Sequence, residues 1–548
     1  MHDSSACLLK NGEIIAFAEE ERFNREKHTG KFPENAVKYC LKKADIDIKQ
    51  VAYVGFFWNP WKGIIKRILN LIVSFDFDNS RIGDYASNFY SMLTIPYKLR
   101  FKYGFRGRFC FISHHEAHIA AAYFLSPFKD AAVVSIDGTG EIDTVLCKNI
   151  NGNSYKTLSR STFPNSLGFF YGAMVEFLGF KMHSDEGKVM GLASYGETIY
   201  YDIFKKLISV NDDGVLKVDA KYLNFNKKDP LFNNKLAQSI GSKRDPSDLI
   251  NERHENIASS AQKVFEHILL DILKYIRSKT STDNICLNGG IFLNCSANGR
   301  VAAESGFKNI FIFPIANDAG TSIGAAYYVH HRILKIKERY ELKHISFGPA
   351  YSDSDIETAL NENRVKYSKP AELHKTTAAY LADNKIIGWF QGAMEAGPRA
   401  LGNRSILASP LNATMKDTLN EKVKHRESFR PFAPAVLFER KDEYFEMEGK
   451  ESPYMLYSFK VKEESKHKIP AVIHVDGTAR VQTVKYDNNP LLYSLIKEFD
   501  KITGVPVIIN TSFNVQGEPI VCSPEDAIRC FLNTKIDVLC IGSYVVEK

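Results

Sequence analysis

The sequence predicts an α/β protein of two domains, and three observations carry this prediction. A chain of 548 residues is too long for a single hydrophobic core. Short apolar runs typical of buried strands alternate with helix-forming stretches over the first 330 residues. After residue 385 the motifs change, and arginine-containing loops replace histidine and Asp-Gly motifs. We therefore place the domains at residues 1–350 and 370–548, with the junction near residues 346–370.

Composition limits the classes of function. The chain is 44% hydrophobic and 25% charged, as in ordinary globular proteins. A formal net charge of +7 is mild for this length, and no Lys/Arg block is interleaved with aromatic residues, so we expect no nucleic-acid partner. The nine cysteines form no C-x-x-C pair, which predicts neither a zinc finger nor a disulfide framework and suits a reducing cytoplasm.

No membrane partner is expected either. The N-terminus carries no basic-then-apolar signal segment, and no run reaches the ~20 apolar residues that a membrane span needs. The closest run, residues 63–75, is interrupted by Lys66 and Arg67. It predicts an amphipathic helix over a core, with a membrane-surface or acceptor-binding helix as the alternative.

The first elements form a hairpin and a charged loop. Lys10-Asn11-Gly12 is a turn, since Asn-Gly supplies the positive φ angles of tight hairpins, and residues 13–18 are the returning strand. The charged run 19–28 predicts a solvated loop and helix start, with a ligand-binding loop as the alternative. Residues 51–57 read as a buried strand.

The residues from 113 to 141 predict a metal site. His114 and His118 are four apart, which on a helix places both imidazoles on one face. Residues 133–136 read as a buried strand that ends at Asp137, and residues 144–147 continue a hairpin. Asp318 follows another buried strand, 310–313, and is the natural fourth ligand. The alternative is two unrelated histidines, a turn aspartate and a helix N-cap.

Two glycine-containing segments suit phosphate. Lys188, in Glu186-Gly187-Lys188, could place a cation beside a phosphate, although such a segment is more often an ordinary loop. Asn288, Gly289 and Gly290 lie between a strand and a helix start, where backbone N–H groups favour anions.

Beyond the strand at 386–390, cationic side chains recur in short motifs rich in Gly, Pro and hydroxyl residues. Arginine forks grip phosphate bidentately, and several of them together predict a basic cleft for a polyphosphate, whereas any one alone would more often be a surface salt bridge. The cations in these motifs are Arg399, Arg404, Lys424, Arg426, Arg430 and Arg480.

The order of these motifs resembles known architectures. Strand-turn-strand units with Asp-Gly loops, followed by strand-Gly-Gly-helix units, resemble the duplicated ribonuclease-H-like fold of actin and sugar kinases. Taken together, the motifs resemble the O-carbamoyltransferases that include the nodulation-factor and tobramycin-tailoring enzymes. The matching stretches are residues 2–6, 114–118, 137–141, 166–168, 186–192, 288–290, 317–320, 397–405, 429–434 and 510–514. Residues 58–103 and 212–245 match least, and there we expect acceptor specificity.

The resemblance implies a two-step enzyme. A YrdC-like C-terminal domain would form carbamoyl adenylate from carbamoyl phosphate and ATP, with Mg²⁺ accompanying ATP. A threonylcarbamoyl-transferase-like N-terminal domain with a divalent metal would transfer the carbamoyl group to a hydroxyl of a small-molecule or sugar acceptor. Fe²⁺ is the metal that the resemblance favours, and Mn²⁺ and Zn²⁺ are alternatives.

The resemblance also implies roles for individual residues. His2, Asp137 and Lys188 would be catalytic, with His2 as the general base at the acceptor hydroxyl. His114, His118, Asp137 and Asp318 would hold the metal. Nucleotide or carbamoyl phosphate would contact Gly138, Gly140, Asn288, Gly289, Gly290, Arg399, Arg404, Lys424, Arg426, Arg430, His474, Arg480, Asn510, Ser512 and Asn514.

Several alternatives stay open. The family normally has a short strand ahead of the His2-Asp3 motif, so we expect the native chain to begin upstream of Met1. A hydrogenase-maturation carbamoyltransferase would share both modules, but it should add an acylphosphatase segment and paired C-x-x-C motifs. A non-catalytic nucleotide-binding or regulatory homologue is the third alternative. The acceptor and the oligomeric state, a homodimer included, are not set by the sequence.

Overall fold

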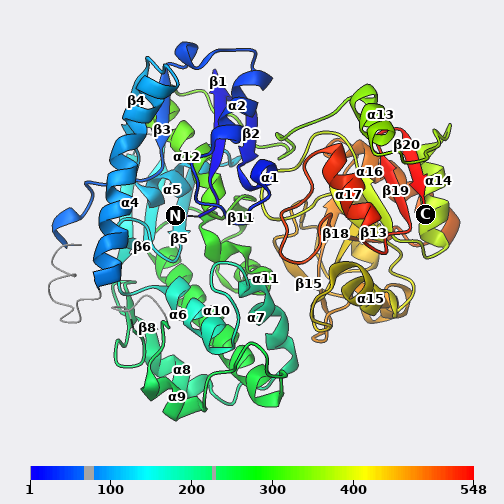
Figure 1. Cartoon of the computed structure of the whole chain (residues 1–548). Coiled ribbons are helices and arrows are strands. Elements are labelled where there is room, and N and C mark those ends of the chain that lie inside the picture. Colours follow the sequence, from blue (N-terminus) through cyan, green and yellow to red (C-terminus); the bar gives the residue numbers. More distant parts are fainter. Residues whose placement is uncertain (1, 67–78, 153, 225–229) are drawn as a thin grey trace. The chain divides into compact units, whose positions relative to one another are not determined.

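The computed structural model describes residues 2–66, 79–152, 154–224 and 230–548, which form two compact units. One unit contains residues 7–15 and 40–342, and the other contains residues 2–6, 16–39 and 343–548. Helices and strands alternate in both, as Figure 1 shows, which confirms the predicted α/β class. Relative to the predicted ranges 1–350 and 370–548, this division assigns residues 2–6 and 16–39 to the C-terminal unit.

The N-terminal unit is built on a mixed five-stranded sheet in the order β11-β10-β5-β6-β7. Strands β5, β10 and β11 are parallel, whereas β6 and β7 form an antiparallel meander with β5. The strands are β5 (Asp130–Ile136), β6 (Asp143–Asn151), β7 (Ser154–Thr162), β10 (Asn284–Asn288) and β11 (Asn309–Ile312). The predicted strands at 133–136, 144–147 and 310–313 are thus confirmed.

Smaller sheets and helices complete this unit. The strands β3 (Tyr53–Phe56) and β4 (Arg108–Phe111) pair in parallel, β8 (Ile208–Val210) pairs with β9 (Leu216–Val218), and β1 (Ser5–Lys10) pairs with β2 (Glu13–Glu19) in the hairpin predicted from Asn11-Gly12. The helices of this unit are α4 (Asn79–Tyr97), α5 (His114–Phe124), α6 (Leu167–Phe177), α7 (Glu186–Leu192), α8 (Tyr201–Leu207), α9 (Asn234–Ile240), α10 (Glu252–Ser278), α11 (Cys295–Glu304) and α12 (Thr321–Tyr328). Helix α2 (Glu34–Lys43) and the strands β1 and β2 cross the division of the chain and contribute residues to both units. Most of the predicted amphipathic helix at 63–75 lies outside the described residues.

Helix α5 occupies the centre of the N-terminal unit. It packs against β5, β10 and α12, and ten of its eleven residues are buried. Its contact with α12 is close: a Cβ on Gly324 would lie 1.9 Å from the carbonyl oxygen of Ala117. A helix that is buried on nearly every side belongs to a core, so the three histidines of α5 are core residues.

The C-terminal unit is built on a seven-stranded sheet in the order β17-β14-β18-β13-β12-β19-β20. Alternate residues face opposite cores: Val507 and Ile509 join one hydrophobic cluster and Ile508 joins the other. The strands are β12 (Ile387–Phe390), β13 (Arg404–Ala408), β14 (Ala433–Leu437), β17 (Gln482–Val484), β18 (Val507–Ser512), β19 (Val538–Ile541) and β20 (Tyr544–Glu547).

Helices cover both faces of this sheet. Helix α13 packs with α17 over one cluster and α14 packs with α16 over the other. The remaining elements are α1 (Glu21–Asn24), α13 (Asp353–Glu362), α14 (Leu373–Ala382), α15 (Met415–Thr418), α16 (Pro490–Thr503), α17 (Pro524–Leu532), and the paired strands β15 (Ser458–Lys460) and β16 (Thr478–Arg480).

The charged run 19–28 differs from its prediction as a solvated loop. Glu19, Glu21 and Arg22 are at most 8% exposed. The Arg22 guanidinium lies 2.6 Å from Glu19 and 3.1 Å from Glu21, and it donates to the Gly397 carbonyl. Arg25 donates to the carbonyls of residues 519 and 520. Opposite charges and carbonyl acceptors replace water here, which explains how this run joins the C-terminal unit.

Candidate metal centre and basic cluster

Four predicted side chains converge at the carboxyl end of β5. His118 Nε2 lies 3.2 Å from Asp137 Oδ2, and His114 Nε2 lies 3.7 Å from the same oxygen. Asp318 Oδ1 lies 3.6 Å from His114 Nε2 and 4.0 Å from His118 Nε2. One donor atom from each residue falls within 4.8 Å of all the others. The structure therefore brings together the complete ligand set drawn from the sequence.

The donor atoms fit a divalent cation. Both ring nitrogens of His114 and of His118 are buried, and no hydrogen bond joins them to any residue that the structure describes. Two ligands that are each about 2.1 Å from one ion lie roughly 3.0–3.4 Å apart, close to the spacings here. The histidine rings are 4.7 Å apart and nearly perpendicular. Buried nitrogens with no partner are costly, and a bound metal would satisfy them.

The carboxylates set the charge of the centre. Burial alone would lower the pKa of His114, but Asp318, Asp137 and Glu141 raise it. Burial would raise the pKa of Asp137, but the two imidazoles hold it well below its ordinary value. The carboxylates thus stay ionised and attract positive charge, as a cation site requires.

Asp318 is not the helix N-cap that the alternative interpretation proposed. It begins a short 3₁₀ turn, Asp318–Gly320, ahead of α12, and no side chain caps that turn. Its carboxylate lies beside the histidines, 3.6 Å from His114 Nε2.

Two residues that the sequence reasoning did not single out, Glu141 and His115, support the candidate metal ligands. Glu141 accepts the backbone N–H of His114 at 2.9 Å, at the start of α5. His115 Nδ1 lies 2.7 Å from Ser135 Oγ, and its Nε2 lies 2.9 Å from the Asp143 carbonyl. A carbonyl oxygen can only accept a hydrogen bond, so Nε2 of His115 carries the proton. Its Nδ1 therefore accepts from the Ser135 hydroxyl. Burial lowers the pKa of His115 to about 3, which keeps it neutral. The one signal in the sequence for this role of His115 is its place between two other polar residues, His114 and Glu116.

The glycine turns serve this centre through the backbone. Asp137 Oδ1 accepts the N–H of Gly138 at 2.6 Å, and Oδ2 lies 3.3 Å from the Gly290 nitrogen. Gly289 has φ +105°, and a Cβ there would lie 2.0 Å from the Ile136 carbonyl oxygen. Asn288 was predicted to bind nucleotide, yet it is fully buried and donates to the His118 carbonyl at 2.8 Å. Its amide positions α5, because both the donor and the acceptor are used inside the fold.

Gly140 and Lys188 belong to the same unit. The Gly140 N–H donates to the Asp143 carbonyl at 2.7 Å. Lys188 lies on helix α7, where a loop was expected, and its ammonium is 3.3 Å from Asp185 and 5.4 Å from the Phe180 ring centre.

His2 lies in the C-terminal unit beside an aspartate. His2 Nδ1 is 3.0 Å from Asp3 Oδ2, and His28 Nδ1 is 2.7 Å from Asp3 Oδ1. Burial would raise the pKa of Asp3, but the two imidazoles hold it well below its ordinary value. The Asp3 carboxylate thus orients the imidazoles of both His2 and His28.

Most of the predicted cations of the C-terminal unit gather in a basic cluster, which we define as Lys424, Arg426, Arg430 and Arg480. Burial lowers the pKa of Lys424 strongly, and Arg426 and Arg430 lower it further. Burial also lowers the pKa of Arg426, with further contributions from Arg430 and Arg480. Cations that depress one another's pKa values are poised for an anion.

Polar groups of β18 and the loop after it hold the lysine of this cluster. Lys424 Nζ donates to the Ser512 carbonyl, to the Asn514 carbonyl at 3.0 Å and to Asn514 Oδ1 at 2.9 Å. The Asn510 amide donates to Gln482 Oε1 at 2.7 Å. His474 Nδ1 lies 3.2 Å from Thr478 Oγ1, and burial lowers its pKa to about 4.

Arg404 does not fit the phosphate-binding role predicted for it. It is fully buried, and its terminal nitrogens donate to the carbonyls of Gln391, Gly392 and Pro349. Its guanidinium carbon stacks 3.7 Å from the Phe390 ring centre. Because these carbonyls take the donors that a phosphate would use, we withdraw Arg404 from the binding set.

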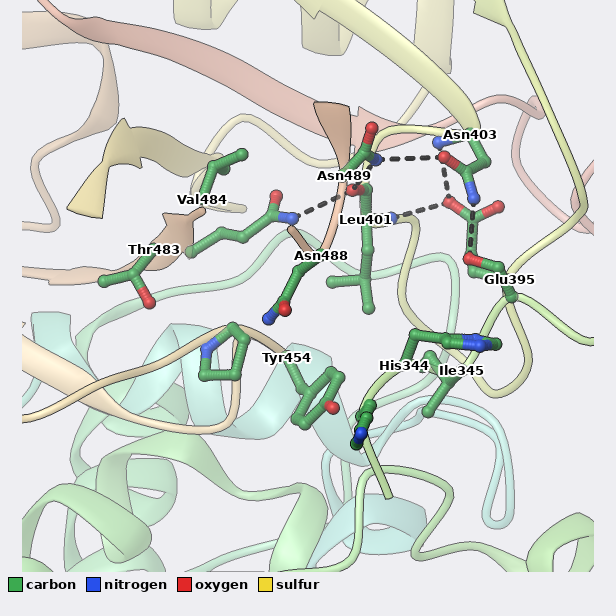
Figure 2. Close-up of a pocket in the computed structure, with 14 residues that line it drawn as sticks. His344, Ile345, Glu395, Leu401, Asn403, Tyr454, Thr483, Val484, Asn488 and Asn489 are labelled. Atoms are coloured by element: carbon green, nitrogen blue, oxygen red, sulfur yellow. Dashed lines mark hydrogen bonds between the residues drawn. The ribbon is translucent and has the colours of Figure 1, made fainter. Parts of the chain in front are cut away.

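Glu395 braces the loop that carries Arg399. Its Oε1 accepts the backbone N–H groups of Leu401, Asn403 and Arg404 at 2.7–3.3 Å. Figure 2 shows this carboxylate beside a cavity of about 40 Å³, which has room for about one or two water molecules and not for a nucleotide. Gln482 and Asn489 close the same network by donating to the Leu401 carbonyl.

The fold and the two sites define an α/β protein with a His₂Asp₂ cluster in one unit and the basic cluster in the other. Family models described as carbamoyltransferase N-terminus and C-terminus match residues 1–327 and 378–548. The chain belongs to the carbamoyltransferase family and is an enzyme of that class.

Relatives in bacteria agree with this assignment. An uncharacterised protein of Synechocystis is 39% identical over 100% of this chain and 95% of its own. The nodulation protein NolNO of Sinorhizobium fredii is 35% identical over 100% and 79%, and the 3'-hydroxymethylcephem-O-carbamoyltransferase of Amycolatopsis lactamdurans is 30% identical over 80% and 81%. Among solved structures, component A of the Acidaminococcus fermentans (R)-2-hydroxyglutaryl-CoA dehydratase aligns with a TM-score of 0.32 and 14% identity over 61% of this chain and 95% of that one.

Proposed function

We propose that this carbamoyltransferase is ATP-dependent and O-specific. It makes carbamoyl adenylate from carbamoyl phosphate and ATP and transfers the carbamoyl group to a hydroxyl of a small-molecule or sugar acceptor. The observation that carries the proposal is the convergence of His114, His118, Asp137 and Asp318, found in a chain that also holds a basic cluster. The Amycolatopsis relative, named as an O-carbamoyltransferase, supports a hydroxyl acceptor.

The domain roles follow from the resemblance and from topology. The sheet order β11-β10-β5-β6-β7, an antiparallel meander followed by parallel strands, supports a ribonuclease-H-like unit of the actin and sugar-kinase type. We assign carbamoyl transfer to this unit, predicted as 1–350. We assign adenylate formation, on a YrdC-like fold, to the unit predicted as 370–548.

Adenylate formation would use the basic cluster. Water cleaves the P–O bond of carbamoyl phosphate to release phosphate, and an oxygen of the resulting carbamate attacks the α-phosphorus of ATP. The bond to pyrophosphate breaks, and pyrophosphate leaves with the electron pair. Arg426 and Arg480 would neutralise the charge that builds on the phosphates, and Mg²⁺ would accompany ATP. Lys424, whose ammonium donates to Ser512 and Asn514, would hold these two residues of the proposed binding set in place. Arg399, Arg430, His474, Asn510, Ser512 and Asn514 complete the proposed binding set, and Gly138, Gly140, Gly289 and Gly290 are proposed nucleotide contacts of the other unit.

Carbamoyl transfer would follow in the N-terminal unit. The acceptor oxygen attacks the carbamoyl carbon, the bond to the adenylate oxygen breaks, and AMP leaves with the electron pair. A divalent metal bound there supplies Lewis acidity. Asp137 fixes the ligand geometry, and Lys188 is proposed to balance phosphate charge. The general base that the resemblance implies is His2, which belongs to the C-terminal unit and whose Nδ1 lies 3.0 Å from Asp3 Oδ2.

The two half-reactions can be tested separately. Purified chain is incubated with carbamoyl phosphate, ATP and a panel of hydroxylated acceptors, and mass spectrometry detects a carbamoyl adduct with a mass gain of 43 Da, roughly one CONH unit. Exchange of labelled pyrophosphate into ATP, dependent on carbamoyl phosphate, reports the first step. Metal analysis reports occupancy of the centre.

Each result separates the alternatives. Exchange and an adduct together support the proposal. Metal-free protein without exchange would favour a non-catalytic nucleotide-binding homologue. Exchange that leads to carbamoylation of a protein thiol, with no hydroxyl adduct, would favour a hydrogenase-maturation role.

A further inference from the structure

Helix α4 carries a row of exposed aromatic side chains at its C-terminal end. Tyr90, Tyr97 and Phe101 are 70%, 67% and 79% exposed. Phe101 lies on the π-helical turn that continues α4 from Lys98 to Lys102. The spacings of seven and four place the three rings along one side of the helix. The rings of Tyr97 and Phe101 stack with centroids 6.4 Å apart and an interplanar angle of 11°.

The same segment is strongly basic. Residues 85–115 contain five Lys or Arg and no Asp or Glu, so 31 residues carry a formal charge of +5 in a chain whose total is +7. The basic side chains are Lys98, Arg100, Lys102, Arg106 and Arg108, and all but Lys98 are exposed. Arg100 and Lys102 share the π-helical turn with Phe101, and Arg106 and Arg108 follow that turn along the chain. For this segment, we call the three exposed aromatic residues and the four exposed cations the α4 face.

This combination has the chemistry of a membrane-surface contact. Aromatic side chains favour the headgroup level of a bilayer, where an apolar ring enters the interface. Each basic residue near an anionic leaflet adds electrostatic attraction. Among the described residues no helix is long and apolar enough to cross a bilayer, so the contact would be peripheral.

Other occupants fit this face less well. A second copy related by a two-fold axis would bring one basic segment against the other, and like charges repel. Single-stranded nucleic acid binds by stacking its bases on aromatic faces, whereas Tyr97 and Phe101 already stack on each other. We therefore propose that the α4 face docks the enzyme on an anionic lipid bilayer. This inference does not depend on the proposed function.

The test is partition of the full chain onto lipid vesicles. Vesicles of phosphatidylcholine alone are compared with vesicles that contain 30% phosphatidylglycerol, about one anionic lipid in three, by flotation at roughly 0.1 and 0.5 M NaCl. We expect partition at least tenfold stronger onto the anionic vesicles. We also expect it to weaken at the higher salt, where the Debye length falls from about 10 Å to ~4 Å.

Two variants separate the aromatic and the electrostatic parts of the face. Y90S/Y97S/F101S removes the rings, and R100Q/R106Q/R108Q removes three charges. Each should lower partition by more than tenfold, since one basic residue contributes a factor of roughly five. The matched control K217Q/K235Q/K243Q removes the same charge from exposed positions elsewhere and should stay within about twofold of the native chain.

Several results would overturn the inference. These are a native chain that ignores anionic vesicles, or both triple variants binding as the native chain does. A dimer in light scattering that Y90S/Y97S/F101S dissociates would assign the face to a second copy instead. Circular dichroism and pyrophosphate exchange check that each variant folds, and R100Q/R106Q/R108Q alone decides the result if the aromatic variant does not fold.

Discussion

The candidate metal centre brings opposite charges together, whereas the basic cluster brings like charges together. In the metal centre, two carboxylates face two imidazoles, and the pKa of His114 rises while that of Asp137 falls. In the basic cluster, like charges face one another, and the pKa values of Lys424 and Arg426 both fall. Carboxylates and imidazoles attract one another in the first arrangement, whereas the cations of the second repel one another until an anion binds.

Because of this difference, we expect mutations at the two sites to affect stability and function differently. Removing a ligand from the metal centre deletes an attraction. Removing a cation from the basic cluster deletes a repulsion as well as a binding group. Function and stability should therefore fall together at the first site and separate at the second.

The largest effect is expected at the metal centre. Asp318→Asn removes one ligand and one negative charge, and we expect it to lose bound metal and to lower carbamoyl transfer by about a thousandfold or more. Pyrophosphate exchange should stay within about threefold, because adenylate formation uses the other unit. Metal analysis, exchange and adduct formation are measured on the same preparation.

The matched control for this substitution is Asp213→Asn, at an exposed carboxylate of the same unit. It should retain metal and both activities. Loss of exchange in Asp318→Asn together with loss of transfer would contradict the separation of the two steps.

The next largest effect is expected in the basic cluster. Arg480 Nε is buried without a hydrogen-bond partner, and Arg480 lowers the pKa of Arg426. We expect Arg480→Gln to reduce pyrophosphate exchange by roughly a hundredfold, since a charge-assisted contact is worth about 1.5–3 kcal/mol. The melting temperature without ligand should be unchanged or higher. A melting temperature that falls by several degrees would show that Arg480 is structural, as Arg404 is.

A third, smaller effect is expected on stability at Glu395, a carboxylate that lies outside both proposed sites. Glu395→Ala removes the acceptor of three backbone N–H groups, and we expect it to cost about 2–4 kcal/mol of unfolding free energy. Glu395→Gln keeps one acceptor oxygen and should cost less than half as much. Urea unfolding measures both, and equal losses in the two variants would contradict the role of Oε1.

The smallest effect per residue is the pH dependence of the neutral histidines. Burial lowers the pKa of His115 to about 3 and those of His331 and His474 to about 4, against 6.5 in the unfolded chain. Below pH 6.5 the unfolded chain therefore binds more protons than the folded chain, so stability falls as pH falls from about 6.5 to 4.

Each such histidine adds a slope of up to about 1.4 kcal/mol per pH unit. His331 is sandwiched between Phe124 and Tyr327, so His331→Phe should reduce the slope by one proton without adding charge. Urea unfolding at several pH values measures this, and an unchanged slope in His331→Phe would contradict a neutral His331.

The elements nearest the metal centre were predictable because their patterns are local. The i,i+4 histidines, the apolar run of β5 and the aspartate at its end each follow from a few adjacent residues. The internal contacts of Asn288 and Arg404 were not predictable, for the opposite reason. Both are polar residues in glycine-containing motifs, and only the fold shows that distant carbonyls use their donors.

By itself, the sequence determined the α/β class, the strands and helices around the histidines, the four side chains proposed as metal ligands and the cations of the C-terminal unit, because residue type and short spacing carry that information. Only the tertiary structure decided which charges are buried, which are paired and which face solvent. The acidic and basic run at 19–28 became a buried ion-pair network, and the aromatic residues of α4 became a surface. Burial and pairing depend on contacts between residues hundreds of positions apart, and no local pattern encodes them.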